Sequence, residues 1–450
     1  MDNLLNISAI DGRYNGLTKE LAPYLSEYGF FKYRVKVEVL YYIFLNKTLN
    51  FVNLDYNNLM NIKIIMSNFT LDECMKVKEI EKKINHDVKS VEYYLVSKLK
   101  ENDALKNTTQ FIHFGLTSQD INNTSITLMI KDSLNHVILP ELNKVIYEIF
   151  NKTLEWIKIV MTSHTHGQPA VPTTLGKEFQ VFHYRLKKQL KLLESTTYYG
   201  KFGGASGNLN AHYTAYSDIQ WDKEFAQFLG EIGLERELLT TQIDNYENLA
   251  VVFDCLRRIN TIIVDMNRDI WHYISIEYLT QKFNKDEVGS STMPQKINPI
   301  NFENSEGNLL MANSMLDFMS NKLPVSRLQR DLTDSTVLRN VGAIFGHILI
   351  GFKNCYKGLL KLDVNKEKIK QDLYKNAAII TEGLQVVLKK HGIQNSYELV
   401  KEFSRNNKKI SRENIVEFIV SLKIDISIKK ELLLINQDNY IGNANKIKIY

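Results

Sequence analysis

Proline and glycine are scarce in this 450-residue chain, which contains 7 prolines and 21 glycines. Average usage would give about 20 and about 30 for a chain of this length. Proline interrupts helices and glycine weakens them, so their scarcity favours long helices over an architecture of short strands and turns. With 44% hydrophobic and 24% charged residues, the composition is that of a globular protein and excludes global disorder.

Cysteine is also rare. The three cysteines, Cys74, Cys255 and Cys355, are too few and too scattered for a disulfide framework or a structural zinc site, so we expect a reducing, cytoplasmic compartment. The opening stretch MDNLLNISAIDGRY lacks the basic and apolar regions of a signal peptide. No stretch approaches the roughly 18 apolar residues that a membrane span needs, so we expect no membrane partner.

Charge of one sign is not concentrated anywhere in the chain. Lysine and arginine number 56 against 51 aspartates and glutamates, which gives a net charge of +5, and the lysines are spread throughout. This mild, scattered excess predicts no nucleic-acid partner, although it would suit an anionic small molecule.

Apolar residues recur at helical spacing through most of the chain. The longest such pattern covers residues 244–283, and a helix of that length would run about 60 Å. Strand signals are nearly absent, and we predict an all-α fold. Further helices are predicted at 135–160, 175–193, 212–229, 303–319 and 335–360, and at 75–99 with an interruption at 85–87.

These patterns divide the chain into three predicted helical domains. An N-terminal helical domain covers 1–112, a central bundle of very long helices covers 113–364, and a smaller C-terminal helical domain covers 365–450. A single globular domain does not need a rod of that length, whereas a helical bundle shared between subunits does.

Residues 284–301, with the sequence NKDEVGSSTMPQKINPIN, lie between two of the predicted helices. A connection of this length without secondary structure is usually functional or disordered. Met293, Ile297 and Ile300 are apolar among polar neighbours, which suits a lid that closes onto a ligand. Ser290 and Ser291 lack the Gly-x-Ser-x-Gly elbow, which disfavours a hydrolase triad.

The loop and five other segments carry a resemblance to a known family. The segment GSSTMPQKINPINFENSEGN resembles the signature loop of the fumarase/aspartase/argininosuccinate lyase superfamily, and together with the others it is similar to the adenylosuccinate lyase family. The other segments, in order, are DGRY at 11–14, NHDV at 85–88, HFGLTSQDINN at 113–123, THGQPA at 165–170 and LPVSRLQRDLTDSTVLRN at 323–340. None of them departs from the family in a way that suggests an inactive enzyme.

The resemblance implies an anti β-elimination that releases fumarate. It assigns Ser290 as the base that removes the Cβ proton, with Ser291 as second choice, and His166 as the acid that protonates the departing nitrogen. A serine base needs a dry site and positive neighbours, and Lys296 is the candidate cation. Imidazole suits proton exchange near neutral pH, and Glu303 matches the family's carboxylate that orients this histidine.

The resemblance also implies a set of substrate-binding residues. His86, which we also count among the catalytic candidates, is flanked by Asn85 and Asp87 in a segment that holds the substrate. Thr117 and Ser118 would grip a carboxylate at a helix start, although simple N-capping explains the same two residues and both can be true. The remaining residues are Gln242 and Asn298 near the succinyl group or signature loop, and Arg13, Tyr14, Arg330, Ser335 and Arg339 for the nucleotide.

The spacing of residues adds three observations. Ser335 and Arg339 are four residues apart and share one helix face, and Thr333 and Asp334 look like caps that open this helix, which would make an anion cradle with Arg330. Pairing with nearby aspartates is the alternative. No H-x-x-x-H or H-E-x-x-H spacing is present, so no metal site is predicted. Gly203–Gly207 lacks the P-loop lysine spacing and predicts a tight connection between two helices.

By resemblance we expect cleavage of adenylosuccinate to AMP and fumarate, and of the succinylated aminoimidazole carboxamide ribotide to the free carboxamide and fumarate, without a cofactor (EC 4.3.2.2). The family is a homotetramer whose active sites gather residues from three chains. The alternatives are argininosuccinate lyase or another fumarate-releasing sibling, and, more remotely, a helical scaffold that has lost catalysis.

Overall fold

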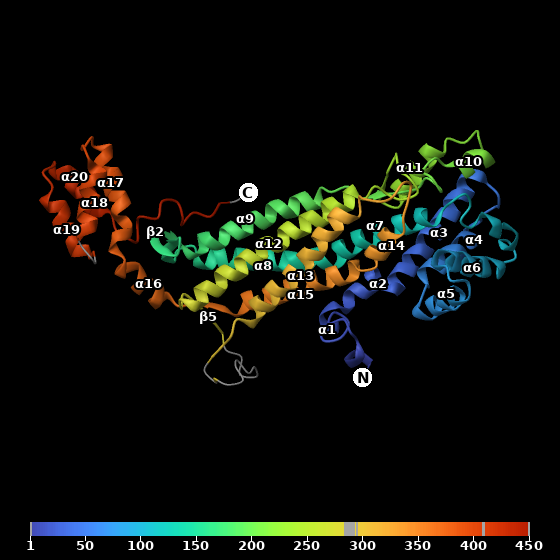
Figure 1. Cartoon of the computed structure of the whole chain (residues 1–450), viewed down its shortest axis with the longest axis horizontal. Helices are drawn as coiled ribbons and strands as arrows, with labels where there is room; N and C mark the ends of the chain where they lie inside the picture. The colour runs from blue at the N-terminus through green and yellow to red at the C-terminus, as the bar shows by residue number, and fades with distance from the viewer. Residues whose placement is uncertain (1, 283–292, 294–295, 407–409, 449–450) are drawn as a thin grey trace. The chain divides into compact units, whose positions relative to one another are not determined.

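The computed structural model describes residues 2–282, 293, 296–406 and 410–448, and the described chain is mainly helical, as predicted (Figure 1). It divides into two compact units. The first unit comprises Met1–Leu142, Gln189–Thr261 and Gly307–Lys353, and the second comprises Asn143–Lys188, Ile262–Glu306 and Asn354–Tyr450. Five helices contribute residues to both units: α8 (Leu139–Trp156), α9 (Leu175–Glu194), α12 (Glu247–Ser275), α13 (Ile300–Lys322) and α15 (Val341–Lys361).

The first unit is built around α3 (Glu27–Leu49), which packs against α7 (Ser118–Ser133) and against the antiparallel pair α5 (Leu71–Ile84) and α6 (Asp87–Lys100). A core of buried side chains that includes Val35, Val77 and Val91 joins these helices. The other elements of the first unit are η1 (Asp2–Leu5), α1 (Asn15–Thr18), η2 (Lys19–Leu21), α2 (Ala22–Leu25), α4 (Tyr56–Ser67), η3 (Lys106–Phe111), the π-turn Leu134–Ile138, β3 (Tyr199–Gly200), α10 (Asn210–Ala215), α11 (Trp221–Glu231), β4 (Glu235–Arg236) and α14 (Thr333–Leu338).

The second unit has its own hydrophobic core, formed largely by short C-terminal helices around Leu384, Leu388 and Ile415. Its elements, beyond the shared helices, are β1 (Val160–Thr165), β2 (Gln168–Thr174), β5 (Leu279–Gln281), β6 (Leu362–Val364), α16 (Lys366–Lys375), η5 (Ala377–Ile380), α17 (Thr381–Lys390), α18 (Ser396–Asn406), α19 (Arg412–Ser421) and α20 (Ile426–Leu434).

Short strands are present although strand patterns are nearly absent from the sequence. Within the described ranges, β1 pairs with β2 and β5 with β6 in antiparallel fashion, and β3 pairs with β4 in parallel. The hairpin β1–β2 falls on the THGQPA segment, where strict alternation is hidden by a bulge between Thr162 and Ser163.

The long helix predicted at 244–283 is shorter in the structure. It corresponds to α12, whose 29 residues span about 44 Å. Tyr246 and Glu277, which flank it, both have φ of 64°, in the left-handed region that interrupts a helix. The apolar periodicity continues past Glu277 into β5, which is why the pattern alone overestimated the length.

Two other predicted helices are broken. The pattern at 212–229 forms α10 and α11, separated after Ala215, and the pattern at 335–360 forms α14 and α15. Gly203–Gly207 joins β3 to the short α10 rather than two long helices. The interruption predicted at 85–87 is confirmed, because α5 ends at Ile84 and α6 begins at Asp87.

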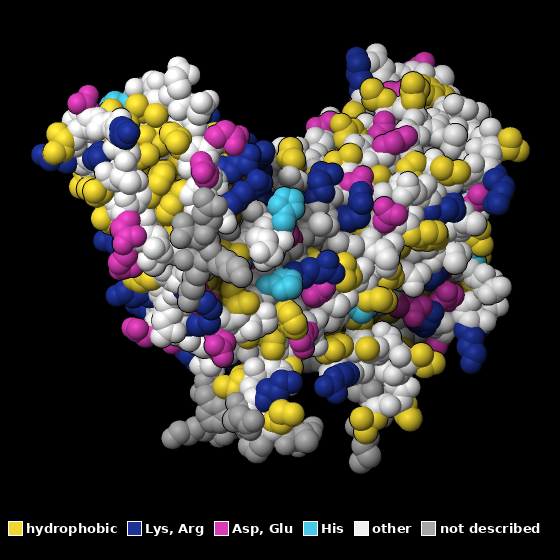
Figure 2. Space-filling model, turned by 60° about the vertical axis from the view of Figure 1, so that its left-hand side comes forward, with side chains coloured by type: hydrophobic (Ala, Val, Ile, Leu, Met, Phe, Trp, Pro, Cys, Tyr) yellow, Lys and Arg dark blue, Asp and Glu magenta, His cyan; other side chains and the backbone are white. Residues whose placement is uncertain are grey.

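One stretch of the described chain, Thr333–Lys361, is long and apolar enough to cross a membrane by length and composition, contrary to the sequence expectation. More than half of its most apolar window is buried inside the protein, a pattern that core helices of soluble proteins share. All three cysteines are free and buried. The face shown in Figure 2 mixes lysine and arginine with acidic and hydrophobic side chains, without a large field of one sign.

Candidate functional site

The turn between α5 and α6 presents the NHDV segment. Asn85 ends α5 in the left-handed conformation, with φ of 53°, which asparagine tolerates better than most residues. His86 is the N-cap of α6, and its Nδ1 accepts a hydrogen bond from the backbone N–H of Lys89 at 3.1 Å. Because Nδ1 is an acceptor, the neutral imidazole carries its proton on Nε2, which stays available as a donor.

Asp87 is held between two arginines. Its Oδ2 lies 2.6 Å from a guanidinium nitrogen of Arg34 and 3.2 Å from one of Arg339, and its Oδ1 accepts from the Val88 amide at 2.9 Å. Burial works to raise the pKa of Asp87, but the charge of Arg34 and the Val88 bond outweigh it, so the pKa lies below its usual value. Asp87 is therefore an anion that binds Arg339.

Arg34 is a site residue that the sequence reasoning missed. It lies on α3 and is 1% exposed, with its guanidinium carbon 3.7 Å from the centre of the Phe30 ring. Its Nε donates to Asn122 Oδ1 at 2.8 Å while another nitrogen holds Asp87. The available signal was an arginine among the aromatic and valine residues of FFKYRVKVEVLYY, since a charge on a buried face requires a partner.

The start of α7 contributes the TSQD segment. Thr117 is the N-cap, and its backbone N–H donates to Asp120 Oδ2 at 2.7 Å, so the capping interpretation holds for this residue. Ser118 is the first helical residue, and Gln119 Nε2 donates to Ser335 Oγ at 3.1 Å. The positive end of the α7 dipole lies at these residues, which favours an anion.

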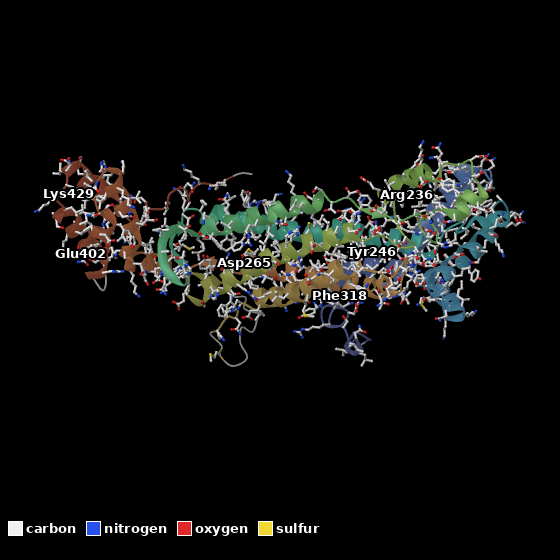
Figure 3. The ribbon with its side chains drawn as sticks, turned by 45° about the horizontal axis from the view of Figure 1, so that its top comes forward. Arg236, Tyr246, Asp265, Phe318, Glu402 and Lys429 are labelled. Carbon is white, nitrogen blue, oxygen red and sulfur yellow. The ribbon has the colours of Figure 1, made fainter. Side chains whose placement is uncertain are left out.

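The segment around α14 supplies the cationic side. Arg330 donates to Gln242 Oε1 at 2.9 Å, Ser335 lies on α14, and Arg339 is the C-cap of that helix. The predicted capping by Thr333 and Asp334 is wrong. Asp331 accepts the Thr333 amide at 2.7 Å, and Asp334 is buried, where it accepts from Tyr246 Oη at 2.8 Å (Tyr246 is labelled in Figure 3).

These segments surround one cavity of about 420 Å³ within the first unit, a volume typical of small-molecule sites. Three arginines face it against two carboxylates, Glu81 and Asp87, so its lining has a net positive charge. The predicted residues that line it are Asn85, His86, Asp87, Ser118, Arg330, Ser335 and Arg339. The lining residues that the sequence reasoning did not name are Phe30, Arg34, Glu81, Gln119, Asn122, Ile126, Leu332 and Leu338.

Four predicted residues of the first unit do not line this cavity. Thr117 and Gln242 lie next to it, because Thr117 directly precedes the lining residue Ser118 and Gln242 accepts from the lining residue Arg330. Arg13 is exposed and Tyr14 is half-buried at the start of α1, outside the cavity lining.

His166 occupies the tip of the hairpin β1–β2 in the second unit. His166 and Gly167 form its two-residue loop, with φ of 53° and 73°. Positive φ at both positions is the requirement of a type I′ turn, for which glycine is favoured at the second position. This turn leaves the imidazole exposed, and within the described residues its side chain has no hydrogen-bond partner.

Glu303 lies in the first turn of α13, and its Oε1 accepts from the indole N–H of Trp271 at 3.1 Å. In the described part of this single chain, no hydrogen bond joins Glu303 to His166. Lys296 is exposed and Asn298 is half-buried just before α13. Ser290 and Ser291 lie outside the described residues.

Metal ligation has no support in the described ranges, where no three His, Cys, Asp or Glu side chains gather as a metal-binding group.

Two family descriptions match this chain. Residues 12–313 match a family described as Lyase, and residues 326–441 match one described as Adenylosuccinate lyase C-terminal. Among curated proteins, the chain is 48% identical to adenylosuccinate lyase of Dictyostelium discoideum, over 98% of this chain and 97% of the relative. It is 40% identical to adenylosuccinate lyase of Escherichia coli, over 99% and 98%.

Solved structures support the fold. The 3-carboxy-cis,cis-muconate lactonizing enzyme from Pseudomonas putida superposes with a TM-score of 0.76 at 17% identity, covering 96% of each chain. Fumarate lyase from Mesorhizobium sp. BNC1 superposes with a TM-score of 0.73 at 17% identity, covering 95% of this chain and 96% of the other. Fold, motifs and near-complete alignment agree, and the chain is a lyase that belongs to the adenylosuccinate lyase family of the fumarase/aspartase superfamily.

Proposed function

We propose that this protein cleaves adenylosuccinate to AMP and fumarate in purine biosynthesis, and cleaves the succinylated aminoimidazole carboxamide ribotide to AICAR and fumarate. The observation that carries the proposal is the cavity of about 420 Å³, where three arginines, serine hydroxyls and a helix N-terminus converge. Such a lining suits a ligand with several separate anionic groups, and both substrates carry one phosphate and two carboxylates.

The phosphate would be bound by Arg330, Ser335 and Arg339. In the free chain, Arg339 pairs with Asp87 at 3.2 Å and Arg330 donates to Gln242 at 2.9 Å. These contacts hold both guanidinium groups near the cavity, so that a phosphate dianion can replace or share them without a large rearrangement. Arg13 and Tyr14 would join the phosphate from the DGRY segment.

The succinyl group would lie toward the start of α7. Ser118 and Thr117 offer hydroxyls there, and the helix terminus offers backbone N–H groups to a carboxylate. Gln242 and Asn298 would add amide contacts. His86, with its Nε2 proton available, and Asn85 would donate to the ligand from the opposite turn, while Asp87 orients Arg339.

The reaction is a β-elimination without redox change. Ser290, ionised in a closed site beside Lys296, would take the Cβ proton, and the electrons left on Cβ delocalise into the adjacent carboxylate. The Cβ electrons then form the double bond of fumarate as the C–N bond breaks, and His166 would protonate the departing nitrogen. Glu303 would orient and charge this histidine, with one carboxylate oxygen already held by Trp271.

A homotetramer with shared active sites is part of this proposal. His166 and Glu303 are both exposed in the single chain, so residues of partner chains can complete the pair. Helix α13 is apolar on more than one face: Leu309 and Leu316 are buried, whereas Met311 and Phe318 (labelled in Figure 3) are 53% and 54% exposed. Exposed large apolar side chains on a helix whose opposite side is buried support coverage by other copies.

We further propose a cytoplasmic location, since three free, buried cysteines suit a reducing compartment. The division into domains 1–112, 113–364 and 365–450 also stays a prediction.

The direct test is incubation of the purified protein with adenylosuccinate, followed by absorbance and by enzymatic detection of fumarate. Turnover of adenylosuccinate and of the ribotide, with none of argininosuccinate, is expected. Absence of adenylosuccinate turnover by folded, oligomeric protein would refute the proposal.

Single variants test the roles. Ser290→Ala and His166→Ala should each nearly abolish turnover without changing the oligomer mass. His164→Ala is the matched control, because His164 is exposed on the same hairpin and has no proposed role. Ser291→Ala decides which serine is the base, since near-normal activity there leaves Ser290. Mixing the inactive Ser290 and His166 variants should partly restore activity, and no restoration after proven subunit exchange would contradict shared sites.

A further inference from the structure

A fully buried ion pair lies outside the cavity lining in the first unit. Lys201, just after β3, places its Nζ 2.6 Å from Asp120 Oδ1, and both side chains are 0% exposed. Removing two charges from water offsets most of their attraction, so such pairs contribute little net stability compared with apolar residues of the same volume. Neither residue has a place in the elimination chemistry, so the pair needs another physical explanation.

The Asp120 carboxylate connects the start of α7 to the glycine loop. Its Oδ2 accepts from the Thr117 amide at 2.7 Å, and its Oδ1 accepts from the amides of Gly203 and Gly204 at 2.8 and 3.1 Å. Ser118 and Gln119, which line the cavity, are the residues between Thr117 and Asp120 in sequence. The carboxylate therefore determines where the cavity-facing end of α7 lies.

A chain of hydrogen bonds leads from Lys201 to the arginine side of the same cavity. Lys201 Nζ also donates to the carbonyl of Gly204 at 2.7 Å. The next carbonyl, that of Ala205, accepts from Gln242 Nε2 at 3.0 Å, and Gln242 Oε1 accepts from Arg330 at 2.9 Å. Gly204 has φ of 73°, so the backbone turn between these contacts requires glycine.

The Lys201–Asp120 pair is required for electrostatic reasons as well as for geometric ones. Asp120 is the third residue of α7, where a carboxylate favours the helix but repels any anion bound at the same terminus. Lys201 neutralises that carboxylate at 2.6 Å in a site without solvent, where screening is weak. The helix terminus can then keep its cap and still accept a ligand carboxylate.

We propose that Lys201 is a positioning residue for anion binding: paired with Asp120, it anchors the glycine loop and the α7 terminus, and it cancels the charge that would otherwise repel the substrate carboxylate. This rests on the proposed function for the identity of the anion. It predicts that loss of Lys201 weakens ligand binding whereas loss of Asp120 does not, although both losses lower stability.

The test compares Lys201→Met, Asp120→Asn and the double variant in the full-length protein. Lys201→Met should lower the thermal midpoint and raise the KM for adenylosuccinate about tenfold, as expected for one uncompensated negative charge roughly a helical turn from the ligand. Asp120→Asn should also lower the midpoint and reduce kcat, because the Thr117 cap is weakened, but it should leave KM unchanged or lower it. The double variant should regain most of the lost stability and a KM within a few-fold of wild type.

Ile62→Ala is the matched control, since Ile62 is 1% exposed on α4, which contributes no residue to the cavity. It should lower the midpoint with KM unchanged. If KM rises in both single variants in step with the loss of stability, or stays unchanged in folded Lys201→Met, the inference is wrong. Should Lys201→Met fail to fold, Asp120→Asn and the double variant still decide, because a KM raised about tenfold in either refutes it.

Equilibrium binding of fumarate and of AMP, measured by calorimetry, separates this inference from the proposed function. Lack of adenylosuccinate turnover by the wild type would overturn the proposed function. The calorimetric affinities of the same variants would still judge the role of Lys201, which requires weaker fumarate binding in Lys201→Met than in Asp120→Asn; equal affinities would refute it.

Discussion

Replacement of His212 by phenylalanine should make the protein less sensitive to acid. His212 is 0% exposed on α10, with its ring 4.9 Å from the rings of both Trp221 and Phe225. Its Nε2 lies 2.9 Å from Tyr41 Oη, whose single proton is donated to the carbonyl of Phe114 at 2.7 Å. The imidazole is therefore the donor to Tyr41, and Nδ1 has no hydrogen-bond partner among the described residues.

Burial determines the size of the effect. It lowers the pKa of His212 from 6.5 to about 4, although the charge of Asp120 opposes the shift. Because the folded-state pKa is depressed, the unfolded chain binds a proton more readily between these values, so stability falls as the pH decreases below about 6.5. The loss amounts to about 2 kcal/mol near pH 5 and about 3 kcal/mol once the pH is below both values.

The assay is the thermal unfolding midpoint of wild type and His212→Phe at several pH values between about 7.5 and 5. The variant loses one hydrogen bond to Tyr41 but also an unpaired buried nitrogen, so the two proteins should differ little at the upper end. The difference should grow in favour of the variant as the pH falls. Tyr41→Phe is the control, because it removes the partner and retains the titrating ring, so it should keep the acid sensitivity of wild type. A difference between His212→Phe and wild type that does not change with pH would refute this reasoning.

Three further predictions concern the site and its surroundings. Arg34→Met should destabilise the protein by about 3 kcal/mol, because it leaves the Asp87 carboxylate with one cation instead of two. It should also raise the KM for adenylosuccinate. An unchanged thermal midpoint and KM would contradict the buried pairing. Gly167→Ala should cost only about 1 kcal/mol, since φ is 73° but no atom lies within 4 Å of the added Cβ, and it should reduce kcat by altering the turn that carries His166; unaltered kcat would argue against the role of the turn. The pKa of His113 is raised to about 8, because the attraction of Glu38, 2.5 Å away, and of other nearby carboxylates outweighs burial. The charged histidine therefore contributes about 2 kcal/mol of stability below pH 6.5, and this contribution disappears as the pH rises through about 8. If the thermal midpoint of His113→Gln fell as steeply over this pH range as that of wild type, the reasoning would be contradicted.

The candidate site could be predicted in part because its residues come in contiguous segments. NHDV, TSQD and the Arg330–Arg339 stretch each place several polar residues together, and the structure brings members of all three to one cavity. Arg34 does not belong to such a segment of the sequence. Its role depends on Asp87, 53 residues away, and that pairing arises only when α3 packs beside α6.

The features that the amino-acid sequence determined by itself depend on local interactions. Helical periodicity, few glycines and prolines, and the break at Asn85–His86 depend on neighbours within a turn or two, so they can be read directly from the sequence. Other features required the tertiary structure. Asp87 bonds Arg339 across 252 residues, and Lys201 neutralises Asp120 across 81, because packing of the helices brings these charges together. The burial that unites them also determines their chemistry, since charge and pKa respond to the solvent that packing removes.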